Sequence, residues 1–253
     1  MKKILLFTEE AFTVVSLLLY SGGPLTVILS GGASEGDDSG ETNTSLILVL
    51  FFFNYLVTFF LLILRWKKVI QVMKKEKILL LLVGIAIFSF VWSSQPKKTL
   101  TRGIAIAGTS LFGLYLASRY TIKEQLQLLG WMYGIAVVMS FLFIGALPKY
   151  GIMGGVHAGS WRGIYNHKNT LGKVIVPGLT IFLLLASSSK KYSWLFYMAF
   201  SLAFILLLRS GSTSSLLNGI TLITASISFR VFRWRDNLMV PSTIAMVRFG
   251  AIF

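Results

Sequence analysis

The chain has 253 residues, of which 55% are hydrophobic and only 13% are charged, and its formal net charge is +15. A water-soluble domain carries about a quarter of its residues as charged side chains, so this composition excludes an ordinary soluble globular domain. The absence of cysteine excludes disulfides and thiolate catalysis, and two histidines without nearby carboxylates do not make a zinc site.

Long apolar blocks follow one another along the chain. A helix needs about 20 apolar residues to cross the hydrocarbon core of a bilayer. Blocks of about this length occupy 11–30, 45–64, 78–94, 99–117, 127–147, 171–188, 193–208 and 214–229, and a weaker ninth block occupies 237–253. Because backbone groups in lipid must pair within their own segment, we expect helices. The sequence predicts an all-α fold in which 1–253 is a single polytopic transmembrane domain of eight or nine spans.

The distribution of Lys and Arg predicts the orientation of these spans. Short cytoplasmic loops carry an excess of Lys and Arg. Here the excess falls on the side of the amino terminus, above all in one cluster: Arg65, Lys67, Lys68, Lys74, Lys75 and Lys77. We therefore expect a cytoplasmic amino terminus, in a short tail before an uncleaved helix. The loop 31–44 then lies outside, which agrees with its acidic residues and its lack of Lys and Arg. The basic clusters between apolar blocks are typical of an anionic membrane surface, not of a nucleic-acid-binding surface.

The most unusual stretch lies at 160–172, in the predicted outer loop 148–172. It combines cations, a histidine, amides and aromatic rings, namely Trp161, Arg162, Tyr165, Asn166, His167, Lys168 and Asn169. A guanidinium fork suits a phosphate, an ammonium adds a point charge, amides bond sugar hydroxyls and flat rings pack on sugar faces. The N-terminal amides of the following helix would also favour an anion. The alternative is that these residues are interfacial anchors, since aromatic and cationic side chains gather at membrane boundaries.

A second candidate site surrounds Arg209. This arginine directly follows an apolar run, and a cation at that depth is costly unless it is paired or hydrated, which makes it a functional-site hypothesis. The small polar run at 210–214 offers hydroxyl and amide donors, whereas the alternative is an arginine that snorkels from a helix end. Two other outer features are interpreted as structural: a solvated helix end with Lys97, Lys98 and Arg102, and a loop histidine, His157.

At 161–172 the chain resembles the O-antigen ligase and exopolysaccharide-production family of membrane proteins. The stretch from Arg162 to Gly172, RGIYNHKNTLG, is similar to the family's Arg-Gly, His-Lys-Asn and Leu-Gly pattern ahead of a transmembrane helix. The stretch 116–125 is similar to a cytoplasmic segment of the exopolysaccharide branch. The stretch 209–214 is similar to the family's second Arg-containing turn.

The resemblance implies a GT-C-like glycosyltransferase of the bacterial inner membrane, used in lipopolysaccharide or exopolysaccharide biosynthesis. Family members take a glycan from an undecaprenyl diphosphate carrier on the periplasmic side and transfer it to a lipid or glycan acceptor, with no metal and no other cofactor. The expected partners are therefore this lipid-linked glycan, its acceptor and membrane lipids. The matching motifs assign Arg162 and Arg209 to the diphosphate and include His167, which is the catalytic candidate. Lys168, Asn169 and Trp161 complete the expected substrate site on the basis of their side-chain chemistry.

The chain departs from the family at its C-terminal end. Family members continue with a large periplasmic loop that carries a catalytic histidine and then with further helices, whereas this sequence ends at Phe253. We expect a C-terminally truncated member, and its activity as a single chain stays open. Two other function classes stay open as well. A transporter or flippase of a lipid-linked glycan is disfavoured because the spans carry almost no charge, and a non-catalytic membrane subunit or remnant is favoured by the early end.

Overall fold

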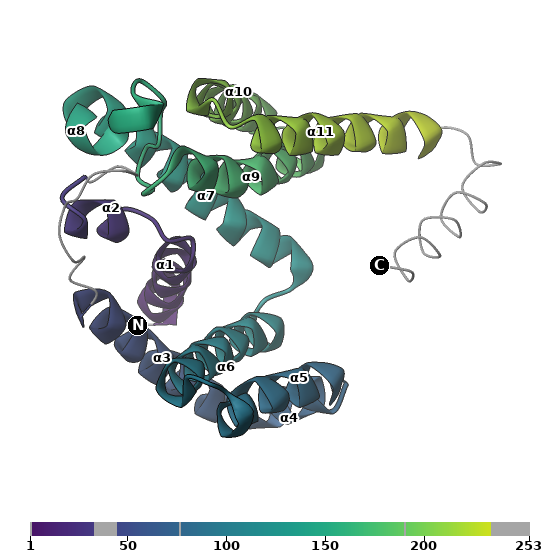
Figure 1. Ribbon diagram of the computed structural model, residues 1–253. Helices are drawn as coiled ribbons and strands as arrows, with labels where there is room; N and C mark the ends of the chain where they lie inside the picture. The colour runs from purple at the N-terminus through teal and green to yellow at the C-terminus, as the bar shows by residue number, and fades with distance from the viewer. Residues whose placement is uncertain (1, 33–44, 76, 190, 234–253) are drawn as a thin grey trace. The chain divides into compact units, whose positions relative to one another are not determined.

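A computed structural model describes residues 2–32, 45–75, 77–189 and 191–233 of the protein (Figure 1). These residues are helical and contain no strand; one isolated antiparallel bridge joins Ile152 and Trp161. Five of their helices are long and apolar enough to cross a membrane: α3 (Ser45–Leu64), α6 (Pro96–Arg119), α7 (Ile122–Ala146), α9 (Lys168–Ser188) and α10 (Ser193–Ser210). The prediction of an all-α fold with helices that can span a membrane is confirmed for these residues. Most of the predicted loop 31–44 and the whole ninth block, 237–253, lie outside the described residues.

The first predicted span differs from the structure. In place of one helix over 11–30, the chain forms α1 (Lys2–Tyr20) and the short α2 (Leu25–Leu29). Gly22 lies between them with a φ of 75°, a left-handed conformation that glycine adopts without the Cβ clash of other residues. Pro24 follows, and a proline disfavours helical dihedrals in the residue before it. The Gly-Gly-Pro sequence therefore ends the helix although further apolar residues follow it.

The third predicted span, 78–94, is also divided. Its α-helical part, α5 (Lys77–Phe88), has 12 residues, followed by a 3₁₀ turn, η1 (Ser89–Trp92). At about 1.5 Å per residue α5 is about 18 Å long, shorter than the roughly 30 Å of a bilayer core. The basic segment between α3 and α5 forms a separate amphipathic helix, α4 (Trp66–Lys75), where the sequence predicts a cytoplasmic loop.

The described chain divides into two compact units, Met1–Ser16 with Glu41–Leu128 and Leu17–Gly40 with Leu129–Phe253. In the first unit α6 packs against α3, α4 and α5. Two glycines of α6 allow this close approach: a Cβ at Gly103 would lie 3.1 Å from the carbonyl oxygen of Ala86 in α5, and one at Gly108 would overlap the ring of Tyr55 in α3. Helix α6 ends at Arg119, and Thr121 and Glu124 form a capping box at the start of α7. The N–H of Thr121 donates to Glu124 Oε2 at 2.7 Å, and the N–H of Glu124 donates to Thr121 Oγ1 at 3.4 Å.

The second unit is built around α9, the most buried of the five long helices. Helices α10 and α11 (Thr213–Arg233) pack on it, as Figure 1 shows. Helix α7 approaches α9 at two glycines, where a Cβ on Gly130 would overlap Leu185 and one on Gly178 would lie 2.9 Å from the ring of Tyr133. The predicted loop 148–172 is partly helical, with α8 (Pro148–Gly151) and a 3₁₀ turn, η2 (Gly155–His157), before α9 begins at Lys168.

Candidate functional site

The loop between α8 and α9 is a compact hairpin held by backbone hydrogen bonds. The N–H groups of Arg162 and Gly163 both donate to the carbonyl oxygen of Gly151, each at 3.0 Å. Nearer the tip, the N–H of Met153 donates to the carbonyl of Ser160 at 2.9 Å. The hairpin, residues 151–163, therefore has a defined shape and fixes the direction in which its side chains leave the backbone.

Glycine at position 163 lets this hairpin lie directly on α7. Its φ is 58°, in the left-handed region, and a Cβ there would lie 2.5 Å from the hydroxyl oxygen of Ser140. Gly172 has the same function one turn into α9, because a Cβ would overlap the side chain of Ser215 in α11 and approach that of Ser212. The Gly of Arg-Gly and the Gly of Leu-Gly are thus explained by close packing.

Arg162 lies inside this framework. Its side chain is fully buried. Its Nε donates to the carbonyl of Tyr150 at 2.9 Å, and its Nη2 donates to the carbonyls of Lys149 at 2.8 Å and Gly32 at 2.6 Å. Helix ends leave carbonyl groups without intrahelical hydrogen-bond partners. Arg162 donates hydrogen bonds to two such carbonyls of the short α8 and also bonds the turn after α2. The structure gives Arg162 a positioning role, and direct binding of a diphosphate by Arg162 stays a prediction.

Arg209 has the opposite environment. It is exposed in the last turn of α10, which ends at Gly211 in a left-handed conformation. Its guanidinium carbon lies 5.0 Å from the ring centroid of Trp161, and its carbonyl accepts the N–H of Trp161 at 3.1 Å. Trp161 in turn packs edge-to-face on Phe141 of α7. Within the described part of the chain the Arg209 guanidinium has no hydrogen bond or ion pair, so it presents its donors outward from an aromatic support.

The His-Lys-Asn part of the motif forms the start of α9. His167 is the N-cap: its Nδ1 accepts the N–H of Asn169 at 3.1 Å, and its carbonyl accepts the N–H groups of Thr170 and Leu171. The N–H of Lys168 points at the sulfur of Met153, 3.4 Å away. These amides already have partners, which differs from the expectation that they would bind an anion directly. The helix dipole still favours negative charge at this end.

Several of the predicted site residues come together at one end of the second unit. The hairpin contacts the turn between α10 and α11 at two places. Trp161 bonds Arg209, and Ser160 lies against Gly211. It contacts the start of α9 through Met153, and the ring of His157 lies edge-on to that of His167 at 5.5 Å between centroids. His157 thus belongs to this cluster, although its sequence context suggested only a loop residue. Lys97, Lys98 and Arg102 belong to the other unit.

Tyr165 closes the hairpin on its inner side. Its side chain is fully buried, and its hydroxyl lies 3.4 Å from that of Ser21 in the turn after α1. Burial raises the pKa of Tyr165 to about 12, because the phenolate would lose its hydration. The ring is therefore a neutral packing element at physiological pH and not an acid or base.

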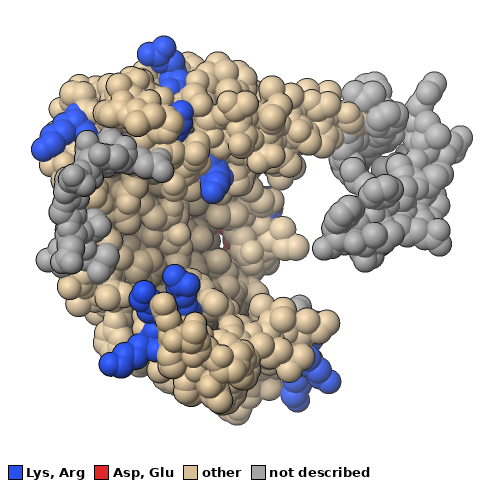
Figure 2. Space-filling model, in the orientation of Figure 1, with Lys and Arg blue, Asp and Glu red and all other residues tan. Residues whose placement is uncertain are grey.

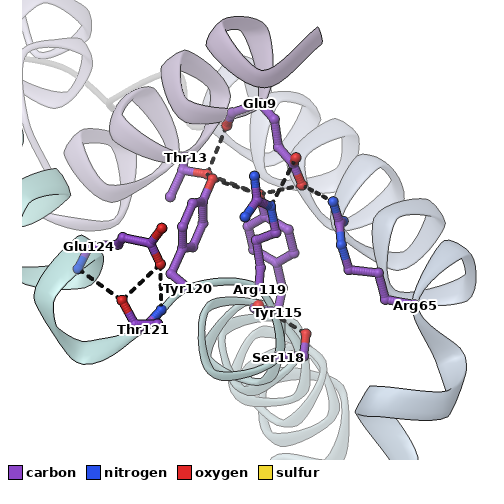
Figure 3. A network of polar contacts seen from close by, with 9 residues as sticks. All are labelled: Glu9, Thr13, Arg65, Tyr115, Ser118, Arg119, Tyr120, Thr121 and Glu124. Carbon is purple, nitrogen blue, oxygen red and sulfur yellow. Dashed lines mark hydrogen bonds and ion pairs between the residues drawn. The ribbon is translucent and has the colours of Figure 1, made fainter. Parts of the chain in front are cut away.

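A charged cluster in the first unit was missed by the sequence analysis (Figure 3). Glu9 of α1 pairs through Oε1 with Arg65 Nη2 at 2.7 Å and through Oε2 with Arg119 Nε at 3.1 Å. The hydroxyl of Tyr115 also donates to Oε1, at 3.2 Å. One carboxylate, only 10% exposed, thus holds two guanidinium groups from the ends of α3 and α6.

A shell of hydroxyl groups surrounds this pair of ion bridges. Thr13 donates to the carbonyl of Glu9 and lies 3.1 and 3.0 Å from the hydroxyls of Tyr115 and Tyr120. The guanidinium of Arg119 stacks 4.7 Å from the ring centroid of Tyr120. The sequence signal for this site was a carboxylate inside an apolar helix, which by default marks a functional or structural partner. From the sequence, Arg65 is predicted only as part of the basic cluster that sets the orientation of the spans.

Comparisons with protein-family models, with curated proteins and with solved structures found no match to this chain. Across the described ranges, no three or more His, Asp or Glu side chains come together as a group that could hold a metal ion. The face of the molecule in Figure 2 carries scattered Lys and Arg side chains and almost no Asp or Glu.

Proposed function

We propose that the protein takes part in glycan transfer from an undecaprenyl diphosphate carrier, as an O-antigen ligase- or polymerase-type membrane glycosyltransferase. The observation that carries this proposal is the exposed Arg209, supported by Trp161 and lying beside the hairpin that leads into the His-Lys-Asn start of α9. A guanidinium on an aromatic face, in the same unit as the ammonium of Lys168 and the side-chain amide of Asn169 at the start of α9, suits a ligand that joins a diphosphate to a sugar.

In this proposal the cations stabilise the leaving group. The acceptor hydroxyl oxygen forms a bond to the anomeric carbon, and the bond from that carbon to the carrier's phosphate oxygen breaks. The electron pair of the broken bond stays on the diphosphate, and the acceptor proton is released to water. Because negative charge grows on the diphosphate in the transition state, prearranged cationic donors lower the barrier.

The motif residues divide into ligand-facing and positioning groups. Arg209 and Lys168 face the diphosphate, Asn169 is exposed and bonds sugar hydroxyls, and Trp161 holds Arg209. Arg162 positions the hairpin through the carbonyls of α8. The catalytic candidate His167 orients sugar or phosphate while its Nδ1 caps α9.

From the same resemblance we propose a GT-C-like bundle of eight or nine spans in the bacterial inner membrane, with a cytoplasmic amino terminus. The partners are the lipid-linked glycan and a lipid or glycan acceptor. The five long apolar helices support the membrane location.

The test measures binding first, so that it does not depend on turnover. The full chain in nanodiscs is titrated with undecaprenyl diphosphate. Arg209→Ala is expected to raise Kd at least about tenfold, since a charged hydrogen bond contributes about 1.5–3 kcal/mol and about 1.4 kcal/mol is tenfold. Arg102→Ala, which removes an exposed arginine from the other unit, is the control and should leave Kd within about twofold of the wild-type value.

Vesicles that contain the chain, labelled lipid-linked glycan and acceptor then report transfer. Labelled acceptor in the wild type and its loss in Arg209→Ala support the proposal. An unchanged Kd in Arg209→Ala refutes the assignment of this site. Movement of the labelled carrier across the vesicle membrane without labelled acceptor would instead identify a transporter.

A further inference from the structure

Four helices of the first unit line an apolar groove of about 540 Å³. Its walls include Phe59 of α3, Trp66 of α4, Leu80 of α5 and Leu114 of α6, and Ser110 is the one hydroxyl-bearing side chain among the described lining residues. Pockets for small organic ligands have volumes of about 300–1,000 Å³. The groove is thus large enough for a ligand, and it offers almost no polar group to bind one.

The groove is open at its side. Phe59 and Trp66 are 55% and 57% exposed, and neither the described helices nor their side chains cover them. In a membrane protein such a surface faces hydrocarbon, and dispersion contacts between packed chains favour filling a groove over leaving voids. A flexible acyl chain fits this chemistry.

Helix α4 adds charge at the rim of the groove. Trp66, Ile70 and Met73 of α4 line the groove, and four lysines of the same helix are exposed: Lys67, Lys68, Lys74 and Lys75. The ammonium of Lys67 lies 5.9 Å from the ring centroid of Trp66, which places a cation beside the groove wall. Trp66–Lys75 contains no Asp or Glu, and with Glu76, which follows in the sequence, the segment still carries a net positive charge.

We infer that this groove binds one anionic phospholipid, with an acyl chain between α3, α4, α5 and α6 and the headgroup phosphate against the α4 lysines. The apolar walls accept the tail of any lipid. The lysines select a headgroup with net negative charge, because each basic residue near an anionic lipid surface contributes about 1 kcal/mol of attraction. This site is separate from the residues of the proposed glycan transfer and does not depend on that function.

Native mass spectrometry of the full chain tests the headgroup selection. The protein is purified with an equimolar mixture of phosphatidylglycerol and phosphatidylcholine, and retained lipids are identified by mass. We expect one retained phosphatidylglycerol. Replacing Lys67 and Lys68 by Gln should lower its affinity about thirtyfold, which is two charges at about 1 kcal/mol each, with about 1.4 kcal/mol per tenfold. The control replaces Lys97 and Lys98, an exposed lysine pair of α6 outside the groove, and should stay within about twofold of wild type.

A second variant tests the tail site. Gly113 lines the groove and a Cβ there meets no atom within 4 Å, so Gly113→Leu adds an apolar side chain at the groove from an unhindered position. Gly84→Leu is the control, because a Cβ at Gly84 is equally unhindered and Gly84 is not among the described lining residues. Both changes raise helix propensity, and unchanged circular dichroism shows that the variants fold.

The two variants decide the inference together. Loss of phosphatidylglycerol in Gly113→Leu but not in Gly84→Leu, together with the lysine effect, supports it. Equal retention of phosphatidylcholine by the wild type overturns the anionic selection. Undiminished lipid retention in Gly113→Leu overturns the groove as the binding site.

Discussion

Replacing Glu9 by Gln should destabilise the first unit while leaving its shape intact. The glutamine keeps the length of the side chain and one oxygen that can accept from Tyr115. It removes the charge that pairs with Arg65 and Arg119, whose side chains are only 26% and 18% exposed. Two mostly buried guanidinium groups would then lie beside each other without a counter-ion.

The magnitude follows from where these charges lie. Removing one partner of a fully buried ion pair costs about 3–5 kcal/mol, whereas an exposed pair contributes about 0–1 kcal/mol. The Glu9 side chain is almost fully buried, whereas both arginine side chains keep some contact with solvent, so the cost lies between these two cases. We therefore expect a loss of about 2–3 kcal/mol in the free energy of unfolding.

The assay is unfolding of the full chain by sodium dodecyl sulfate from mixed micelles, followed by circular dichroism. The matched control is Glu10→Gln, because Glu10 is the neighbouring carboxylate of α1 and is exposed. A double-mutant cycle with Arg119→Gln should give a coupling energy of at least about 1 kcal/mol, as expected for groups in direct contact. If Glu9→Gln unfolds at the same detergent fraction as Glu10→Gln, the ion pairs do not stabilise the unit and the reasoning is refuted.

Three further predictions concern the hairpin and Tyr165, which follows it. Arg162→Gln should lower the free energy of unfolding by at least about 3 kcal/mol, because several buried carbonyls lose a charged hydrogen-bond donor. It should also reduce the yield of folded protein, and a yield equal to that of the wild type would contradict the positioning role. Gly163→Ala should cost about 2–4 kcal/mol, from a left-handed alanine and overlap with Ser140, whereas Gly159→Ala, at φ 85° with open space, reports the conformational part alone. For Tyr165, the raised pKa favours the folded state below pH 10, and this stability is lost as the pH rises from about 10 to 12. Wild type should therefore lose more stability than Tyr165→Phe across that range, and equal losses would show that the buried phenol does not titrate as expected.

Properties that depend on residues close together in the chain could be predicted from the sequence. The apolar blocks predicted α3, α6, α7, α9 and α10 within a few residues, because hydropathy over about 20 residues decides whether a segment favours lipid. The same reasoning failed at Gly22, where backbone preference ended a helix inside an apolar block. The motif at 160–172 also drew attention to a structured loop between two helices.

The role of each charged side chain depends on contacts between helices that are distant in the sequence. Arg162 and Arg209 had equal standing in the sequence, yet Arg162 is buried on carbonyls from residues 12, 13 and 130 positions away, and Arg209 faces outward on Trp161. Glu9 finds Arg119 across 110 residues of sequence. The physical reason is that hydropathy is a sum over local residues, whereas burial and pairing of a charge depend on which distant helices pack beside it.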